Sequence, residues 1–282
     1  MQKQLTLTQE IEIVDEIDKV LLEELLLIVQ NKDTLSLVSF WGHEKLKKDN
    51  VDEEFFKKIM LSVNALVKAN ALRRNYHKIK DVLIDEIKKD PSIKGTRIDM
   101  LFNKVDAFIL IEGFFSQIKT ALDLLAQSLK PVYGYEVHTW AKKNNVSGME
   151  IVSVLTNNLN KELKPHALPI IDLIKRNAEA ITRIVSHRDD TVHYGKLNKV
   201  QGFRYSVSKN EVMPPLILIN DHESAFVHEY LDEALKYIAD FTQEFVITLL
   251  SNLVTDMVIA KKSDGSWSWA THNQSNKVVN KK

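Results

Sequence analysis

The sequence predicts a mainly helical protein. Only 8 glycines and 6 prolines occur in 282 residues, and apolar residues recur at spacings of three and four over long stretches. A hydrophobic content of 44% is ample for one large or two small packed cores. We therefore expect an all-α fold, an up-and-down helical bundle with an N-terminal helical extension and a small β-hairpin insertion.

Three helices are expected in the first half of the chain. The first covers about residues 8–31, and the second begins near Asn50 and ends at Asp90-Pro91. The third, over about 96–130, is the most apolar. Its predicted core-facing seam consists of Ile98, Leu101, Val105, Phe108, Glu112, Phe115, Lys119, Leu122, Ala126 and Leu129. Glu112 interrupts this seam in the middle of "FILIEGFF".

Further helices are expected over about 147–163, from Pro169 to Gly195, and over about 221–259. The "KPHALP" segment should separate the first two. The predicted seam of the middle one consists of Ile170, Ile174, Ala178, Ile181, Val185, Arg188 and Val192. Residues 202–219 alternate around "SKN", which is typical of a β-hairpin.

These elements suggest three regions along the chain. Residues 1–95 form an N-terminal helical segment, and residues 96–260 form a helical bundle that includes the hairpin. The tail, 261–282, is polar and rich in Gly, Ser and Asn, so we expect it to be disordered.

The charge balance and the cysteine count exclude several classes of protein. The 38 basic and 38 acidic residues cancel, so any basic surface for nucleic acid must be local. The chain has no cysteine, which rules out disulfides and thiolate metal sites and fits a reducing cytoplasm. Acidic residues stand where a signal peptide needs its apolar core, and no apolar run approaches the roughly 18 residues of a membrane helix. We expect a cytoplasmic protein that needs neither a membrane nor a metal or other cofactor.

Two charges stand at positions where the seams call for large apolar side chains. These are Glu112 on the third helix and Arg188 on the helix that starts at Pro169. An unpaired buried charge costs several kcal/mol, so each should have a partner or face a cleft. The simplest arrangement pairs them, either as a structural salt bridge or beside a functional cleft.

The residues around Arg188 suggest chemistry. Asp189 and His193 are four apart and share a helix face, so the carboxylate can hold one ring nitrogen. Arg188 and His193 lie about 140° apart around a helix, and they share one surface if the helix ends at Gly195. Together these residues would provide an arginine that can bind a phosphate through two hydrogen bonds, a histidine that can transfer a proton, and a carboxylate that orients the histidine. The alternative is an ordinary polar helix terminus, and His187, four residues after Arg183, is expected to be exposed.

"RDDTVH", residues 188–193, matches the arginine, polar residue, three variable residues, histidine signature of the HEPN superfamily. "ALDLLAQSL" also resembles the helical hairpins of that family, and the resemblance covers about residues 96–260. It implies a four- or five-helix bundle that dimerises and brings two motifs into one cleft. Many such proteins look like metal-independent endoribonucleases of toxin–antitoxin, abortive-infection or CRISPR-linked defence.

Carried onto this chain, the resemblance assigns three roles. His193 would be the general acid or base, Arg188 would stabilise the charged phosphorane, and Asp189 would orient one of them. The implied partners are RNA, a second copy of the chain, and an antitoxin or other defence protein. Gly195 stands where nucleotidyltransferase-regulated toxins carry a tyrosine, which puts that form of control in doubt. A non-catalytic dimerisation, nucleotide-binding or RNA-binding module remains the alternative.

"LRRNYHKIK", residues 72–80, offers a second candidate contact with RNA. Arg73, His77 and Lys80 lie on one helical face with Tyr76 beside them. The alternative is a solvated helix face.

Overall fold

The computed structural model describes residues 53–159, 163–194, 199–220, 223–253, 257–261 and 267–271. This part of the chain is mainly helical, as predicted, and it also carries small antiparallel sheets, so the all-α class is only partly right. None of the described helices is both long enough and apolar enough to cross a membrane. The predicted helix at 8–31 lies outside the described residues.

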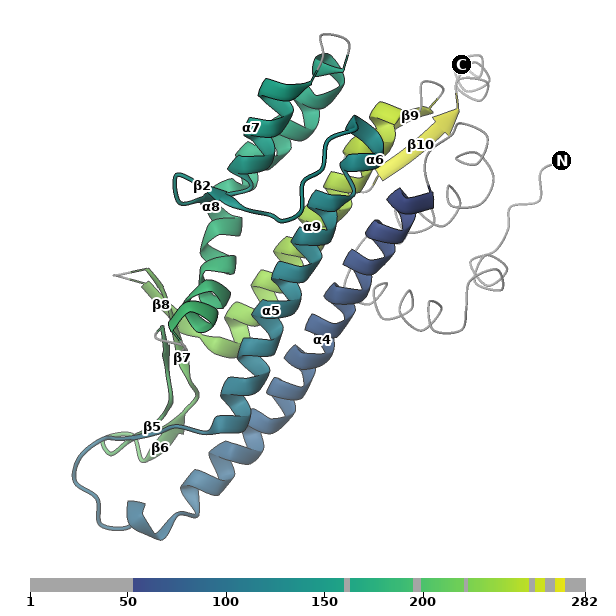
Figure 1. Ribbon diagram of the computed structural model, residues 1–282. Helices are drawn as coiled ribbons and strands as arrows, with labels where there is room; N and C mark the ends of the chain where they lie inside the picture. The colour runs from purple at the N-terminus through teal and green to yellow at the C-terminus, as the bar shows by residue number, and fades with distance from the viewer. Residues whose placement is uncertain are drawn as a thin grey trace, which may run out of the picture. The chain divides into compact units, whose positions relative to one another are not determined.

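The helices are α4 (Glu53–Lys88), α5 (Val105–Gln127), α6 (Lys130–Tyr133), α7 (Met149–Asn158), α8 (Lys164–Tyr194) and α9 (Val227–Leu253), and a 3₁₀ turn spans Pro91–Ile93 (Figure 1). Four antiparallel sheets accompany them. Their strands are β1 (Met100–Phe102), β5 (Phe203–Ser206) and β6 (Glu211–Met213); β4 (Val200–Gln201), β7 (Leu216–Asn220) and β8 (Glu223–Phe226); β2 (Lys142–Lys143) and β3 (Val146–Ser147); and β9 (Met257–Lys261) and β10 (Trp267–Thr271).

The chain divides into two compact units, each assembled from separate stretches of sequence. The first unit contains residues up to Asn64, Ala121–Ala178 and the residues from Ala239 onward. The second unit contains Ala65–Thr120 and Glu179–Ile238. Helices α4, α5, α8 and α9 are each divided between the units, with one segment in the first unit and one in the second. The predicted domain boundary near residue 95 falls inside the second unit, between α4 and α5.

The second unit is held together by the apolar stripes of its four helix segments. Residues at spacings of three and four face inward, among them Leu66, Ala69 and Leu83 on α4; Ala107, Ile111, Phe114, Phe115 and Ile118 on α5; Ile181, Ile184 and Val185 on α8; and Leu231, Leu235 and Ile238 on α9. Burying each large side chain contributes about 1.5–3 kcal/mol. Gly113 lets α5 approach α4 closely, because a Cβ there would lie 3.2 Å from Cδ1 of Leu72. The two helices run alongside each other (Figure 1).

The beginning of α5 differs from the prediction. The helix begins at Val105 rather than near residue 96, because Met100–Phe102 is strand β1, paired with β5 through Leu101 and Arg204. The predicted seam is out of phase in this half of α5, since the buried stripe runs through Ala107, Ile111 and Phe114. The two stripes converge at Phe115, which is buried in both.

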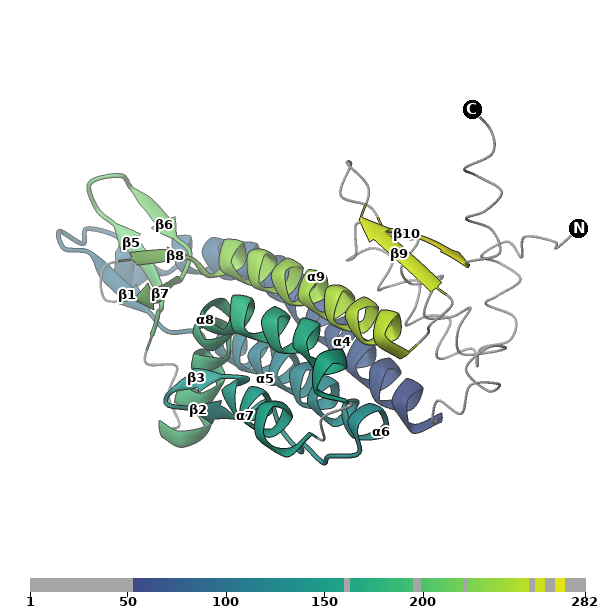
Figure 2. The same cartoon turned by 90° about the horizontal axis from the view of Figure 1, so that it is seen from above.

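The remaining strands shorten the last predicted helix at both ends. β5 and β6 form a hairpin within the predicted hairpin region, and Asn210 takes the left-handed conformation in its turn (φ 52°). β8 occupies residues assigned to the predicted helix, so α9 begins only at Val227, and Figure 2 shows the strands beside this end of α9. β9 pairs with β10, which lies in the tail that we predicted to be disordered.

Trp140 is buried in the core of the first unit. The indole is 1% exposed and packs against Phe241 and Phe245 of α9, with ring centroids 5.4 and 6.0 Å away. Its backbone N–H donates to Oδ1 of Asp123 on α5 at 2.6 Å. Gly148 has a φ of +80° at the start of α7, and a Cβ there would lie 2.9 Å from Nε1 of Trp140.

Helix α8 begins at Lys164, earlier than predicted. Pro165 stands in the first turn, where a helix needs no backbone N–H, so "KPHALP" starts the helix instead of separating two helices. Pro169 is then accommodated inside α8.

Candidate functional site

The predicted catalytic residues lie at the C-terminal end of α8. The helix continues to Tyr194, so positions 188, 189 and 193 belong to its last two turns. Arg188 is half-buried. The side chains of Asp189 and His193 lie outside the described part of the structure, so their contact stays a prediction.

The buried seam of α8 reaches His187 rather than Arg188. His187 is 2% exposed, contrary to the prediction that it is exposed. Its ring lies 4.9 Å from Phe115 of α5 and 5.3 Å from Tyr230 of α9, measured between ring centroids. Burial raises the pKa of Tyr230 to about 12. The predicted seam was shifted by one residue at this turn, to Arg188 instead of His187. With 3.6 residues per turn, either of these two neighbours can continue a spacing of three and four.

Glu112 does not interrupt a buried seam. The residue is exposed, because the buried stripe of α5 passes through Ile111 and Phe115 instead. Among the residues that the structure describes, no ion pair joins Glu112 to Arg188. We expected Glu112 and Arg188 to pair because both predicted seams were misplaced at these turns. That prediction is therefore wrong.

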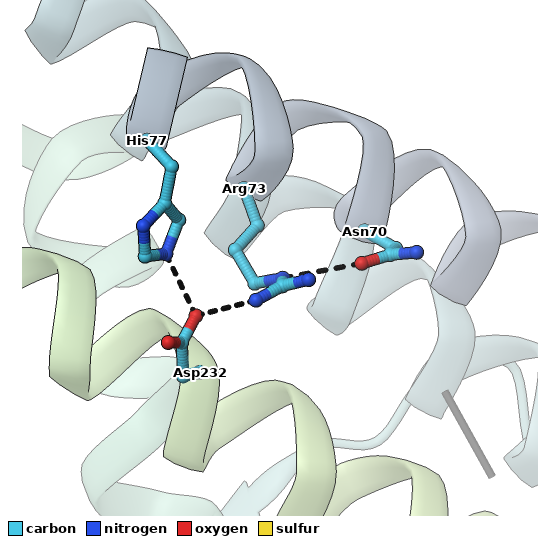
Figure 3. Close-up of polar contacts among 4 residues, drawn as sticks. All are labelled: Asn70, Arg73, His77 and Asp232. Carbon is cyan, nitrogen blue, oxygen red and sulfur yellow. Dashed lines mark hydrogen bonds and ion pairs between the residues drawn. The ribbon is translucent and has the colours of Figure 1, made fainter. Parts of the chain in front are cut away.

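A polar cluster joins α4 to α9 within the second unit, and we call it the Asp232 cluster: Asn70, Arg73, His77 and Asp232 (Figure 3). Oδ1 of Asp232 accepts from Nη1 of Arg73 at 2.6 Å and contacts Nε2 of His77 at 2.8 Å. Nε of Arg73 also donates to Oδ1 of Asn70 at 3.1 Å. With Nε2 donating to the carboxylate, Nδ1 is the acceptor atom of a neutral His77.

Hydrogen bonds within the Asp232 cluster shift the pKa of its carboxyl group. Partial burial would raise the pKa of Asp232, but the hydrogen bonds from Arg73 and His77 outweigh it, and the pKa is lowered. His228 lies 5.9 Å from His77 between ring centroids and stacks on Phe226. Burial and the nearby Lys80 ammonium lower the pKa of His228, so this ring is neutral at pH 7.

The residues predicted to contact RNA already have partners within the protein, so they are not free to bind RNA. The carboxylate of Asp232 engages both Arg73 and His77. Lys80 lies 3.4 Å from Asp81 and its side chain is only 16% exposed. Tyr76 is fully buried, which removes it as a stacking platform for a base and raises the pKa of its phenol.

Sequence reasoning found Arg73 and His77 on α4 but missed their partner. Asp232 is 155 residues beyond His77, and an acidic residue in "YLDEAL" looks like part of a solvated helix face. The helical spacing of Arg73 and His77 was the one available signal that both point toward a neighbouring element.

The described residues contain no group of three or more His, Asp or Glu side chains that could hold a metal ion. No family model matches the chain, and no curated protein or solved structure is significantly similar to it.

Proposed function

We propose that this protein is a metal-independent endoribonuclease with a HEPN-like fold. It acts as a homodimer on RNA, in a defence or toxin setting with an antitoxin or other defence protein as partner. The proposal rests on the "RDDTVH" sequence and is supported by one observation. Helix α8 is continuous from Lys164 to Tyr194, so the whole motif lies on one helix.

The packing of His187 supports a functional role for the end of α8. The ring lies against Phe115 and Tyr230, on two other helices, so the turn that carries Arg188 is anchored. A cation on an anchored turn loses little freedom when it binds a phosphate, and a guanidinium can grip two phosphate oxygens at once. Such pre-organisation is what stabilisation of a charged transition state needs.

The reaction would use the substrate's own hydroxyl as nucleophile. A base, His193 or its equivalent in the second copy, takes the proton of a ribose 2′-hydroxyl, whose oxygen attacks the adjacent phosphorus. The bond to the 5′-oxygen breaks as that oxygen receives a proton, which leaves a 2′,3′-cyclic phosphate and a 5′-hydroxyl end. Arg188 stabilises the pentacovalent phosphorane. DNA lacks the 2′-hydroxyl and would not be cleaved.

The test is cleavage of single-stranded RNA by the purified full chain in EDTA. The wild type should produce cyclic-phosphate ends, while His193→Ala and Arg188→Ala should each lower the rate by about 10²–10⁴-fold. His138→Ala is the matched control, because that side chain is 76% exposed and lies in the first unit. Equal inertness of the wild type and His193→Ala on varied RNAs would refute the catalytic role.

A non-catalytic binding module is the second candidate, and the Asp232 cluster favours it. A carboxylate that engages Arg73 and His77 joins two helices and withdraws both side chains from ligand binding. In this case RNA stays intact and Arg188→Ala acts mainly on melting temperature. Thermal shift against a panel of nucleotides would then identify a ligand.

A further inference from the structure

The end of α8 is electrostatically unfavourable for RNA. Its last two turns, residues 187–194, contain one arginine and two aspartates, so with neutral histidines their formal charge is −1. The backbone carbonyls at the C-terminal end of a helix add a partial negative charge. A phosphate that approaches His193 therefore meets more negative than positive charge, and Arg188 alone does not balance it. The proposed reaction needs a second cation at this end of the helix.

Lys199 brings a cation to α8 from a neighbouring sheet. The residue directly precedes β4, and its backbone carbonyl accepts from the N–H of Leu218 on β7 at 2.7 Å. The side chain is half-buried, and its Nζ lies 3.5 Å from Oγ of Ser186 on α8. The Ser186 hydroxyl itself donates to the backbone carbonyl of Arg183 at 2.8 Å, so its oxygen is the acceptor toward the lysine. The sheet thus holds the backbone of Lys199 while its side chain reaches the helix.

Ser186 stands on the face of α8 that also carries position 193. At about 100° per residue, positions 186 and 193 point in directions only about 20° apart, whereas Arg188 is about 140° from position 193. Along the helix axis, position 186 lies about 10 Å before position 193. Lys199 therefore approaches α8 on the same face as the histidine, two turns before it.

We infer that Lys199 binds a phosphate of the RNA strand beside the one that is cut. The inference rests on the proposed ribonuclease function and adds to it a residue outside the "RDDTVH" motif. Two turns of helix separate Ser186 from position 193, so Lys199 contacts a neighbouring phosphate while Arg188 and His193 act on the scissile one. An ammonium binds a phosphate as a point charge on a flexible stem, so it needs no fixed bidentate geometry. Its single positive charge brings the formal charge of this end of the site from −1 to zero.

Steady-state cleavage of single-stranded RNA by the full chain in EDTA tests this role. Lys199→Gln should raise KM about five- to tenfold and change kcat by less than about twofold, because a contact beside the scissile phosphate is equally strong in the ground state and the transition state. Lys199→Arg keeps the charge and should stay within about twofold of the wild type in both constants. The matched control is Lys209→Gln, because this lysine is 62% exposed on the turn between β5 and β6 of the same unit.

The salt dependence of RNA binding is a readout that a purely structural lysine would not change. Fluorescence anisotropy of a labelled single-stranded RNA measures Kd over a salt series, with every variant carrying His193→Ala so that the RNA stays intact. Each lost phosphate contact makes the slope of log K against log salt shallower by about 0.7 for a single strand. Lys199→Gln should therefore reduce the slope by about 0.7, and Lys209→Gln should leave it unchanged.

Two results would overturn the inference while the ribonuclease function stands. One is a Lys199→Gln variant that cleaves and binds RNA like Lys209→Gln. The other is a Lys199→Arg variant as weak as Lys199→Gln, since the lysine would then be needed for packing rather than for its charge. A wild type that does not cleave RNA would be a different outcome, because it refutes the proposed function and with it this assignment of Lys199.

Discussion

Asp232→Asn tests whether the Asp232 cluster stabilises the second unit. The substitution keeps the shape of the side chain but removes its charge. One carboxylate oxygen lies 2.6 Å from Arg73 and 2.8 Å from His77, so both interactions lose their charged acceptor at once. The guanidinium of Arg73 keeps its bond to Asn70.

The size of the effect follows from the exposure of the partners. Hydrogen bonds to charged groups contribute about 1.5–3 kcal/mol when well buried, and exposed ion pairs about 0.2–1 kcal/mol. The side chains of Arg73, His77 and Asp232 are 25%, 32% and 44% exposed, which places the cluster between these limits. The asparagine oxygen still accepts one hydrogen bond. We expect Asp232→Asn to lower the free energy of unfolding by about 1–2 kcal/mol.

The pH dependence has a definite sign. Because folding lowers the pKa of Asp232, its contribution is complete above the ordinary carboxyl value of 3.8 and disappears as the pH falls through the lower folded-state pKa. The difference between wild type and variant should therefore be constant near neutrality and shrink below pH 3.8. It should also decrease at high salt, which screens partly exposed charges.

Urea denaturation at neutral pH, in low and high salt, measures the difference. Glu233→Gln is the control, because this neighbouring carboxylate is exposed and should change stability by less than about 0.5 kcal/mol. If Asp232→Asn were as harmless as Glu233→Gln at low salt, the cluster would not stabilise the fold and this reasoning would be refuted.

Two further predictions concern Gly148 in the first unit and His228, whose ring lies beside His77 of the Asp232 cluster. Gly148→Ala should lower the free energy of unfolding by about 2–4 kcal/mol in a urea titration, because it adds a clash with Trp140 to a φ of +80°. Gly134→Ala, with a φ of +74° and no atom within 4 Å of the new Cβ, should lose only about 1–2 kcal/mol; equal losses would contradict the packing argument. His228→Gln should flatten the loss of stability below pH 6.5, since a histidine whose pKa folding lowers destabilises the folded state as acid protonates the unfolded chain. A pH profile of His228→Gln that equalled the wild-type profile would contradict this argument.

The local sequence pattern was sufficient to predict the long helices that have one apolar face. α4 and α8 were predicted with their ends displaced by a few residues, because caps and prolines mark them in the sequence. The buried face of α5 was predicted correctly only in the second half of the helix. In "FILIEGFF" nearly every residue is apolar, so two stripes fit the spacing equally well, and only the neighbouring helices decide which one is buried.

What the sequence could not reveal depends on distant partners. β1 exists because residues 203–205 pair with it, about a hundred positions further along. The same holds for the Asp232 cluster, whose acceptor lies on another helix than its donors. His187 is a third case, since its burial is decided by Phe115 and Tyr230 rather than by its polar neighbours Ser186 and Arg188.

The contact among the rings of Phe115, His187 and Tyr230 links substitutions on three helices. The three rings lie 4.9, 5.3 and 6.2 Å apart between centroids, so a change in the volume of one ring alters the space left for the other two. Adjacent helix positions differ by about 100° in direction, so any repacking that turns His187 also turns Arg188. Substitutions at these three positions are therefore expected to be tolerated best in combinations that conserve their summed volume, and a change at position 115 on α5 acts through His187 on the turn of α8 that carries Arg188.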